Sequence, residues 1–443
     1  MSWLAGQLEP ESVSARISGV VLQPRHTALW WCLLALSGLG VLCLCLSLGV
    51  LFYQGVGVWG VNRPAGWGLA IVNFVWWIGI GHAGTLISAI LYLARQPWRT
   101  SINRFAEAMT LFAVCCAGLF PILHLGRPWY FYWLAPYPNR MHLWPQWRSP
   151  LIWDFFAVST YLTVSLLFWY LGLVPDLAVL RDRAQKLWQR RLYGLLALGW
   201  RGSSRHWAVH QRAYLLLACL ATPLVVSVHS IVALDFAAGV VPGWHSTIFP
   251  PFFVAGAIFS GFAMVTTLII PLRSLFDLRD FISHRHLDAM AKMMLLTSIL
   301  VTYGYLAEGF TAWYSGQRPD IGTALDRFQG AYAWIYYTLI FCNSLAPLVF
   351  FWPAARRNTV VLLVVSILIN IGMWTERFII VVQSLTHDFL PAAWRLYVPT
   401  RWDWCLYLGT FGLFSFLMLL FIRFLPALSI SELSEQAIEE RNG

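Results

Sequence analysis

The fold is decided by RFAEAMTLFAVCCAGLFPILHL (104–125) and PLIWDFFAVSTYLTVSLLFWYLGL (150–173), two consecutive apolar segments. Each segment is long enough to cross a hydrocarbon core of about 30 Å as a helix. Eight further segments of the same kind lie at 27–53, 67–94, 212–235, 250–272, 288–315, 329–352, 358–383 and 403–425. The sequence therefore predicts an all-α integral membrane protein with about ten transmembrane helices, in one polytopic domain over residues 1–443.

The composition and the placement of charge support a membrane protein. Hydrophobic residues make up 59% of the chain and charged residues only 11%, whereas soluble domains carry about 25% charged residues. With the N-terminus in the cytoplasm, 21 Lys and Arg residues fall in inner segments, eight in outer loops, and Arg377 lies within a span. Because basic residues collect on the cytoplasmic side, this distribution predicts cytoplasmic N- and C-termini. The net charge of +10 then reflects membrane topology and membrane lipids, not nucleic acid.

Two connections between the predicted spans have a distinctive composition. The inner connection 174–211 alternates leucines with arginines in helical fashion, which is typical of a cytoplasmic amphipathic helix on the membrane surface. The outer loop 126–149 is rich in Pro and aromatic residues. Such a loop is expected to cap a partner subunit or the mouth of a cavity.

His124 and Asp154 form the most informative ionisable pair. His124 lies near the outer end of the third span and Asp154 near the start of the fourth, so both are expected close to one membrane face, with Arg127 just beyond. Titratable groups inside a membrane are costly and usually functional. A histidine and a carboxylate can accept the two protons that a quinol releases on oxidation. We therefore expect these two residues to be catalytic and, with Arg127, to bind quinol.

Other ionisable residues lie within the predicted spans. They are His82 near the middle of the second span, Glu107 near the inner end of the third, His229 and Asp235 in the fifth, Glu308 in the seventh, and Glu376 and Arg377 in the ninth. Structural alternatives exist for several of them. His229 could bond a neighbouring group, Asp235 could be interfacial, and Glu376 with Arg377 could be an internal ion pair.

The sequence shows no redox centre of its own. The eight cysteines lie in or beside spans without the spacing of an iron–sulfur site, and the histidines lack the spacing of a membrane haem. We expect no metal, haem or iron–sulfur cluster in this chain, and an electron acceptor on a partner at the outer face. A proton-coupled transporter is the competing class, although the buried acidic residues lie mostly in the outer half.

The segments WWIGIGHAGTLISAILYLARQPWRTSINRFAEAMTLFAVCCAGLFPILHLGRPWYFYW (76–133) and SPLIWDFF (149–156) resemble the NrfD/PsrC family of polysulfide-reductase membrane subunits. Within that family they are most similar to the ActC branch, the quinol-binding subunits of bacterial alternative complex III. The later spans match more loosely, around His229, Glu308 and Glu376–Arg377.

The resemblance implies a particular architecture and site. It implies a first four-helix bundle (66–235) and a second one (250–383) in inverted arrangement, flanked by the first and last helices. It places a quinol site, lined by His124 and Asp154, at the periplasmic end of the first bundle. It also suggests proton routes, mapped here to His82, Glu107, His229, Asp235, Glu308, Glu376 and Arg377.

The resemblance further implies a respiratory complex in a bacterial inner membrane. The substrate would be quinol, either menaquinol or ubiquinol, and the complex a quinol:acceptor oxidoreductase that delivers electrons to cytochrome c or an oxidase. The implied partners are a periplasmic iron–sulfur subunit, multihaem cytochrome c subunits, a second NrfD-like membrane subunit and, in some complexes, a terminal oxidase. The alternative within the family is the membrane anchor of a molybdopterin (polysulfide-type) reductase.

Overall fold

The computed structural model describes residues 3–4, 9–23, 27–140, 142–387 and 389–442. Over these residues every regular element is a helix, which confirms the predicted all-α fold. Ten helices in this part of the chain are long and apolar enough to cross a membrane, as predicted. The protein is therefore a multi-pass membrane protein.

The ten spans lie close to the predicted segments. Seven are single helices: α2 (Ala28–Gln54), α5 (Asn103–Leu123), α6 (Pro150–Arg183), α8 (Ser204–Ala237), α9 (Phe249–Leu275), α10 (His284–Ser315) and α16 (Arg401–Phe424). The other three spans each contain a π-helical turn. Helix α3 (Leu69–Thr85) continues through the π-helical turn η2 (Leu86–Ile90) into α4 (Leu91–Leu93). In the same way, α12 (Ala333–Ile340) continues through η5 (Phe341–Leu345) into η6 (Ala346–Phe351), and α14 (Thr359–Phe378) continues through η7 (Ile379–Gln383) into α15 (Ser384–Thr386). Such π-helical turns often mark functional sites.

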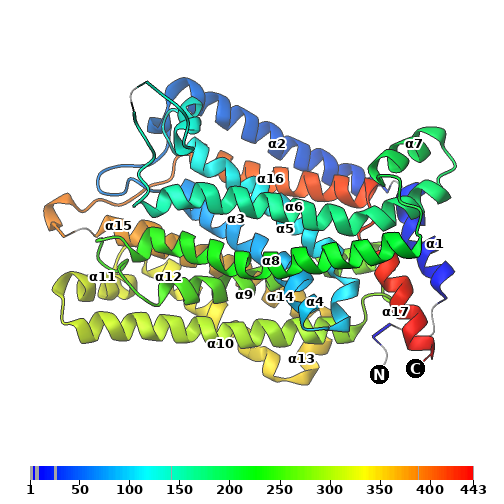
Figure 1. Cartoon of the computed structure of the whole chain (residues 1–443). Helices are drawn as coiled ribbons and strands as arrows, with labels where there is room; N and C mark the ends of the chain where they lie inside the picture. The colour runs from blue at the N-terminus through cyan, green and yellow to red at the C-terminus, as the bar shows by residue number, and fades with distance from the viewer. Residues whose placement is uncertain (1–2, 5–8, 24–26, 141, 388, 443) are drawn as a thin grey trace.

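The two ends of the helical bundle differ in character. The short helices α1 (Pro10–Leu22), α7 (Leu187–Leu196) and α17 (Ile430–Asn442) gather at one end, which we call the terminal face (Figure 1). The opposite end, which we call the loop face, carries η4 (Pro128–Leu134), α11 (Arg318–Gln329) and η8 (Pro391–Ala393). The loop face corresponds to the predicted outer side, and the sidedness itself stays a prediction.

The inner connection is shorter than predicted. Helix α6 continues to Arg183 and α8 begins at Ser204, so that only α7 and short linkers remain between them. Leu187, Trp188 and Leu195 of α7 are exposed, as an amphipathic surface helix requires. The sequence could not reveal the length of α6, because the polar residues of its last turns resemble those of a surface helix.

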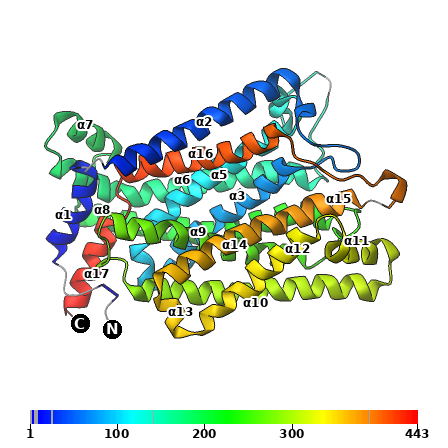
Figure 2. The same ribbon diagram turned by 180° about the vertical axis from the view of Figure 1, so that it is seen from behind.

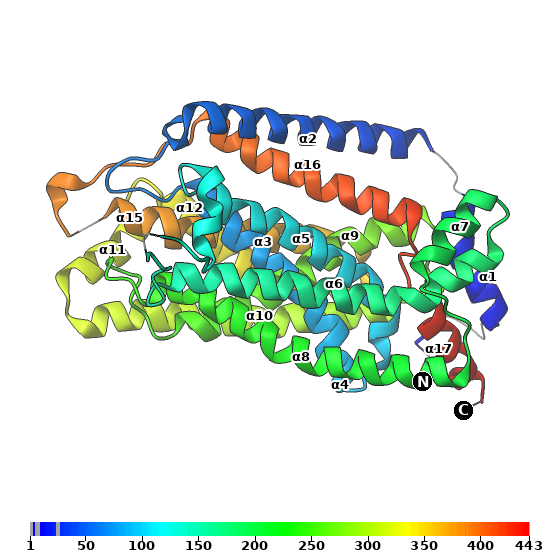
Figure 3. The same cartoon turned by 45° about the horizontal axis from the view of Figure 1, so that its top comes forward.

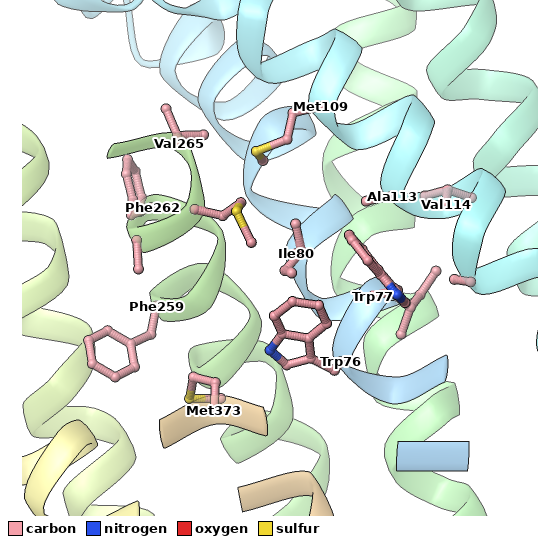
Figure 4. Close-up of a cluster of buried hydrophobic side chains, with 14 of the residues drawn as sticks. Trp76, Trp77, Ile80, Met109, Ala113, Val114, Phe259, Phe262, Val265 and Met373 are labelled. Carbon is pink, nitrogen blue, oxygen red and sulfur yellow. The ribbon is translucent and has the colours of Figure 1, made fainter. Parts of the chain in front are cut away.

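The span that begins with α3 lies at the centre of the molecule. In its most apolar stretch 88% of the residues are buried, against 17% for α2. Trp76 and Ile80 of α3 belong to one buried apolar cluster with Phe262 of α9, Met109 of α5 and Met373 of α14 (Figure 4). Gly84 permits the close approach of α5, because a Cβ atom there would lie 2.0 Å from the carbonyl oxygen of Ala106.

The remaining spans pack around this centre in two groups. Helices α3, α5, α6 and α8 contact one another in sequence order, and α9 contacts both α10 and α14, with α12 packed on α14. Helices α3 and α8 both contact α9 and so join the groups. Helices α2 and α16 lie side by side at the edge (Figures 2 and 3). The two-bundle division and its inverted symmetry stay predictions.

Helix α2 depends on a glycine contact with α16. A Cβ atom at Gly412 would lie 2.5 Å from the Cα atom of Gly40. We expect Gly412→Val to destabilise the protein by about 1–3 kcal/mol, since the two backbones must separate. The measurement is the thermal unfolding midpoint in detergent. Gly38→Val on the partner helix α2 is the control, because a Cβ atom there meets no atom within 4 Å. Equal midpoints for the two variants would contradict this account.

Candidate functional site

His124 directly follows α5 at the loop face, where the helix ends. Gly126 adopts a φ of 76°, and this left-handed conformation turns the chain away from the helix axis. The imidazole lies against two tryptophans: Trp59 stacks on it with ring centroids 6.4 Å apart, and Trp67 meets it edge-on at 6.1 Å. The ring is also within hydrogen-bonding reach of the backbone of Gly66. His124 is thus held in an aromatic setting near the end of the bundle.

Asp154 is paired with a second carboxyl group. It lies in the second turn of α6 and is only 3% exposed, while Asp235 lies in the last turn of the neighbouring helix α8. The two carboxyl groups are close enough to interact electrostatically, and among the described residues the Oδ1 atom of each is buried without a hydrogen-bond partner. Two carboxylates that face each other away from water repel, so a proton shared between them is favourable. Asp235 is thus a half-buried residue that faces Asp154.

A further contact of Trp67 links the surroundings of His124 to those of Asp235. Trp67 packs edge-on against His124 and also against Phe236, at 6.0 Å, and Phe236 follows Asp235 in the chain. Helices α5 and α6, which carry His124 and Asp154, are packed on each other. Arg127 lies just beyond, exposed at the start of η4. The arrangement forms a partly aromatic, partly acidic region at the loop face.

Two histidines meet at mid-depth between α3 and α8. The rings of His82 and His229 are 4.5 Å apart, and Tyr161 stacks on His82 at 5.1 Å. The Nδ1 atom of His82 lies 2.5 Å from the carbonyl oxygen of Ile78. Among the described residues, neither nitrogen of His229 has a hydrogen-bond partner, and both residues are buried. Within the described residues, the structure therefore shows no hydrogen bond from the His229 ring to a neighbouring group.

Glu376 and Arg377 form the internal ion pair that the sequence left open, with 3.0 Å between Arg377 Nη1 and Glu376 Oε1. Both side chains are buried, and the guanidinium lies 4.1 Å from the ring centroid of Phe253. Glu376 also accepts a hydrogen bond from Tyr305, whose hydroxyl accepts one from Asn343 at 2.8 Å. The pair therefore belongs to a polar cluster between α14, α10 and η5.

Glu308 is paired with a residue that the sequence placed in an exposed outer loop. Arg327 Nη2 lies 2.7 Å from Glu308 Oε1, and Arg327 is only 7% exposed. Arg327 is buried because it lies on α11, a helix that the sequence did not predict and that packs against the end of α10. Arg327 is therefore a buried partner of a span residue and not a surface charge.

Glu107 lies in a buried charge cluster at the terminal face. Arg104 Nη1 lies 3.0 Å from Glu107 Oε2, and Arg104 Nη2 lies 3.3 Å from Asp176 Oδ2. Tyr214 donates a hydrogen bond of 3.1 Å to Glu107. Arg104, which the sequence places at the inner end of the third span, is only 1% exposed. The i, i+3 spacing of Arg104 and Glu107 was the available signal, whereas Asp176 lay beyond the predicted end of the fourth span.

The acidic tail of the chain completes this cluster. The backbone N–H and the hydroxyl of Ser431 both donate to Asp176, at 3.0 and 2.9 Å. Glu432 pairs with Arg99 at 2.9 Å and accepts a hydrogen bond from Asn103 at 3.0 Å. Helix α17 therefore lies over the terminal-face end of the bundle and is bound to it by charged groups.

Comparison with known proteins agrees with this architecture. The model of the family described as "Polysulphide reductase, NrfD" matches residues 57–387, a range that includes every site residue predicted from the sequence. The chain belongs to the NrfD polysulphide reductase family, as the resemblance indicated.

Two curated relatives cover most of the chain. A putative dimethyl sulfoxide reductase membrane subunit of Halobacterium salinarum is 26% identical over 427 residues, which covers 88% of this chain and 90% of that protein. The integral membrane subunit of a menaquinone reductase of Nitratidesulfovibrio vulgaris is 24% identical over 381 residues, with 79% and 80% covered. Both are membrane subunits of reductases, and the present chain is a membrane subunit of the same broad class of redox complexes.

Proposed function

We propose that this chain is the quinol-oxidising membrane subunit of a bacterial respiratory quinol:acceptor oxidoreductase. The observation that carries the proposal is the carboxyl pair of Asp154 and Asp235 at the same end of the bundle as His124. A quinol head group between them meets two separate proton acceptors, together with aromatic faces of Trp59 and Trp67 that suit its ring. Arg127 lies at the edge of this region and is assigned to quinone binding.

The chemistry balances with groups that this chain supplies. Oxidation of a quinol to a quinone releases two protons and two electrons. One proton goes to an imidazole nitrogen of His124. The other goes to the Asp154–Asp235 pair, where a proton between the two carboxyl groups relieves their mutual repulsion. The electrons pass to an iron–sulfur cluster of a periplasmic partner subunit.

The loop face suits such a partner. Its η4 segment exposes the five consecutive aromatic residues Trp129, Tyr130, Phe131, Tyr132 and Trp133. The sequence from 125 to 153 contains three arginines and no Asp or Glu. An exposed surface that is both aromatic and basic favours a protein partner with an acidic face.

The wider assembly belongs to the same proposal. In it, the chain is of the ActC type and lies in a bacterial inner membrane with both termini cytoplasmic. Beside it are multihaem cytochrome c subunits, a second NrfD-like membrane subunit and, in some complexes, a terminal oxidase. The residues His82, Glu107, His229, Asp235, Glu308, Glu376 and Arg377 are assigned to the release or translocation of protons.

A second candidate has specific support. The two relatives are named as subunits of a menaquinone reductase and a dimethyl sulfoxide reductase. The chain would then be the membrane anchor of a molybdopterin-type reductase, with the same loop-face site exchanging electrons with quinone. The optical spectrum of the purified complex separates the two candidates, since multihaem cytochromes give strong haem bands and a molybdopterin subunit does not.

Substitution of the carboxyl pair tests the quinol site directly. We expect Asp154→Asn to lower quinol-dependent turnover roughly 100-fold, because the amide cannot take a proton. Assembly should persist, since the amide has the shape of the carboxyl group and can donate a hydrogen bond to Asp235. The measurement is the rate of electron transfer from a soluble quinol in membranes, with assembly checked by native gel. The control is Asp182→Asn, at the exposed end of the same helix. Turnover within twofold of the native rate would contradict the assignment.

A further inference from the structure

The segment 55–68, which we call the covering loop, connects α2 to α3 and lies over His124. It includes the short helix η1 (Val56–Val58). Three of its residues contact the imidazole: Trp59 by stacking, Trp67 edge-on, and Gly66 through its backbone. The position of this loop therefore determines the surroundings of the His124 ring.

The covering loop is hydrogen-bonded to a distant part of the chain, at the start of α16. The backbone N–H of Gly60 donates to Asp403 Oδ2 at 2.8 Å, and the hydroxyl of Thr400 donates to the carbonyl of Val58 at 2.8 Å. At the other end of the loop, the hydroxyl of Tyr397 accepts a hydrogen bond from the backbone N–H of Leu69 at 3.1 Å. These contacts join residues more than 300 positions apart in sequence.

Asp403 takes part in two separate sets of hydrogen bonds at the start of α16. It is 2% exposed, its Oδ2 atom accepts a hydrogen bond from the backbone N–H of Thr400 at 2.8 Å, and its own backbone N–H donates to the Thr400 hydroxyl at 3.4 Å. These bonds form the capping box that begins α16. A capping box needs no further partner, so the bond from Gly60 is additional and serves to hold the covering loop.

Close packing supports the same connection. A Cβ atom at Gly60 would lie 1.9 Å from the carbonyl oxygen of Val398, and one at Gly68 would lie 2.5 Å from the ring of Tyr397. Only glycine allows the covering loop to lie this close to the 394–403 segment. Any side chain at Gly60 must push the loop away from that segment, and with it Trp59.

We infer that Asp403 and Gly60 are positioning residues of the quinol site. They hold the covering loop in the place where Trp59 and Trp67 fix the orientation of the His124 ring, to which the quinol head group is proposed to give a proton. The inference rests on the proposed function, and it assigns a role in that function to the start of the last span. Neither residue touches the quinol itself.

The test compares two alanine substitutions in the same loop. We expect Gly60→Ala to raise the KM for quinol roughly tenfold in assembled complex, which is the equivalent of one lost hydrogen bond. Gly57→Ala is the matched control, because a Cβ atom there meets no atom within 4 Å. A merely structural defect would lower the amount of assembled complex and hence the maximal rate, and would leave KM unchanged.

Substitutions of Asp403 test the inference independently. Asp403→Leu removes the hydrogen bond from Gly60, together with the capping bond to Thr400, and should raise KM as Gly60→Ala does. Asp403→Asn keeps one acceptor oxygen and should stay nearer the native value. If His124→Phe abolishes turnover but both Gly60→Ala and Asp403→Leu keep the native KM, this inference is wrong and the proposed function stands. If His124→Phe left turnover normal, the proposed function itself would be wrong.

Discussion

A complex that carries His124→Phe is expected to lose quinol-dependent electron transfer by a factor of roughly 100 or more while remaining assembled. The phenyl ring keeps the aromatic packing between Trp59 and Trp67, whose ring contacts with His124 are 6.4 and 6.1 Å. It offers no nitrogen to accept a proton. The measurement is steady-state oxidation of a soluble quinol by membranes, normalised to the complex seen on a native gel.

The control for this substitution is His284→Phe, an exposed histidine at the terminal face. It should leave turnover unchanged, since it lies at the other end of the bundle from His124. Normal turnover in an assembled His124→Phe complex would move quinol oxidation to another subunit. This chain would then be a scaffold or a proton path.

Arg104→Met is expected to be the most destabilising single substitution, at about 3–5 kcal/mol. It leaves Glu107 and Asp176 buried without their shared cation, which lies 3.0 and 3.3 Å from them. The expected result is loss of assembled protein, measured by fluorescence-detected gel filtration of detergent extracts.

Two comparisons separate this effect from a general loss of charge. Arg181→Met removes an arginine that is 23% exposed and pairs with Asp182, which is 64% exposed, and it should cost no more than about 1 kcal/mol. The triple variant Arg104→Met, Glu107→Gln, Asp176→Asn removes all three charges and should recover much of the assembly. A triple variant as unstable as the single one would mean that packing of the arginine side chain, and not its charge, holds this end together.

The spans could be predicted from the sequence because a membrane sets both their length and their apolar character. Depth along each span was therefore predictable, and it indicated that His124 and Asp154 lie toward the same end. The rotation of each helix could not be predicted, because nearly all of its faces are apolar. This explains why the contacts between His82 and His229, and between Asp154 and Asp235, emerge only from the structure.

Charged residues at the ends of spans were the least predictable. A count by side assigns Arg104 to an inner segment and Arg327 to an outer loop, but it cannot show that both are buried in ion pairs. Their partners lie on other helices or one turn away, and Arg327 lies on α11, whose polar composition resembles an exposed loop. The bond between Gly60 and Asp403 was equally hidden, because no local pattern links residues 343 positions apart.

The hydrogen bonds and ion pair that hold α17 on the bundle affect how this protein folds during synthesis. Asp176, Arg99 and Asn103 are synthesised well before their partners Ser431 and Glu432, with 255 positions between Asp176 and Ser431. Until those partners are made, the terminal-face end of the first spans carries polar groups without them. A nascent chain cut short before residue 431 would therefore present quality-control proteases with these polar groups lacking their final partners.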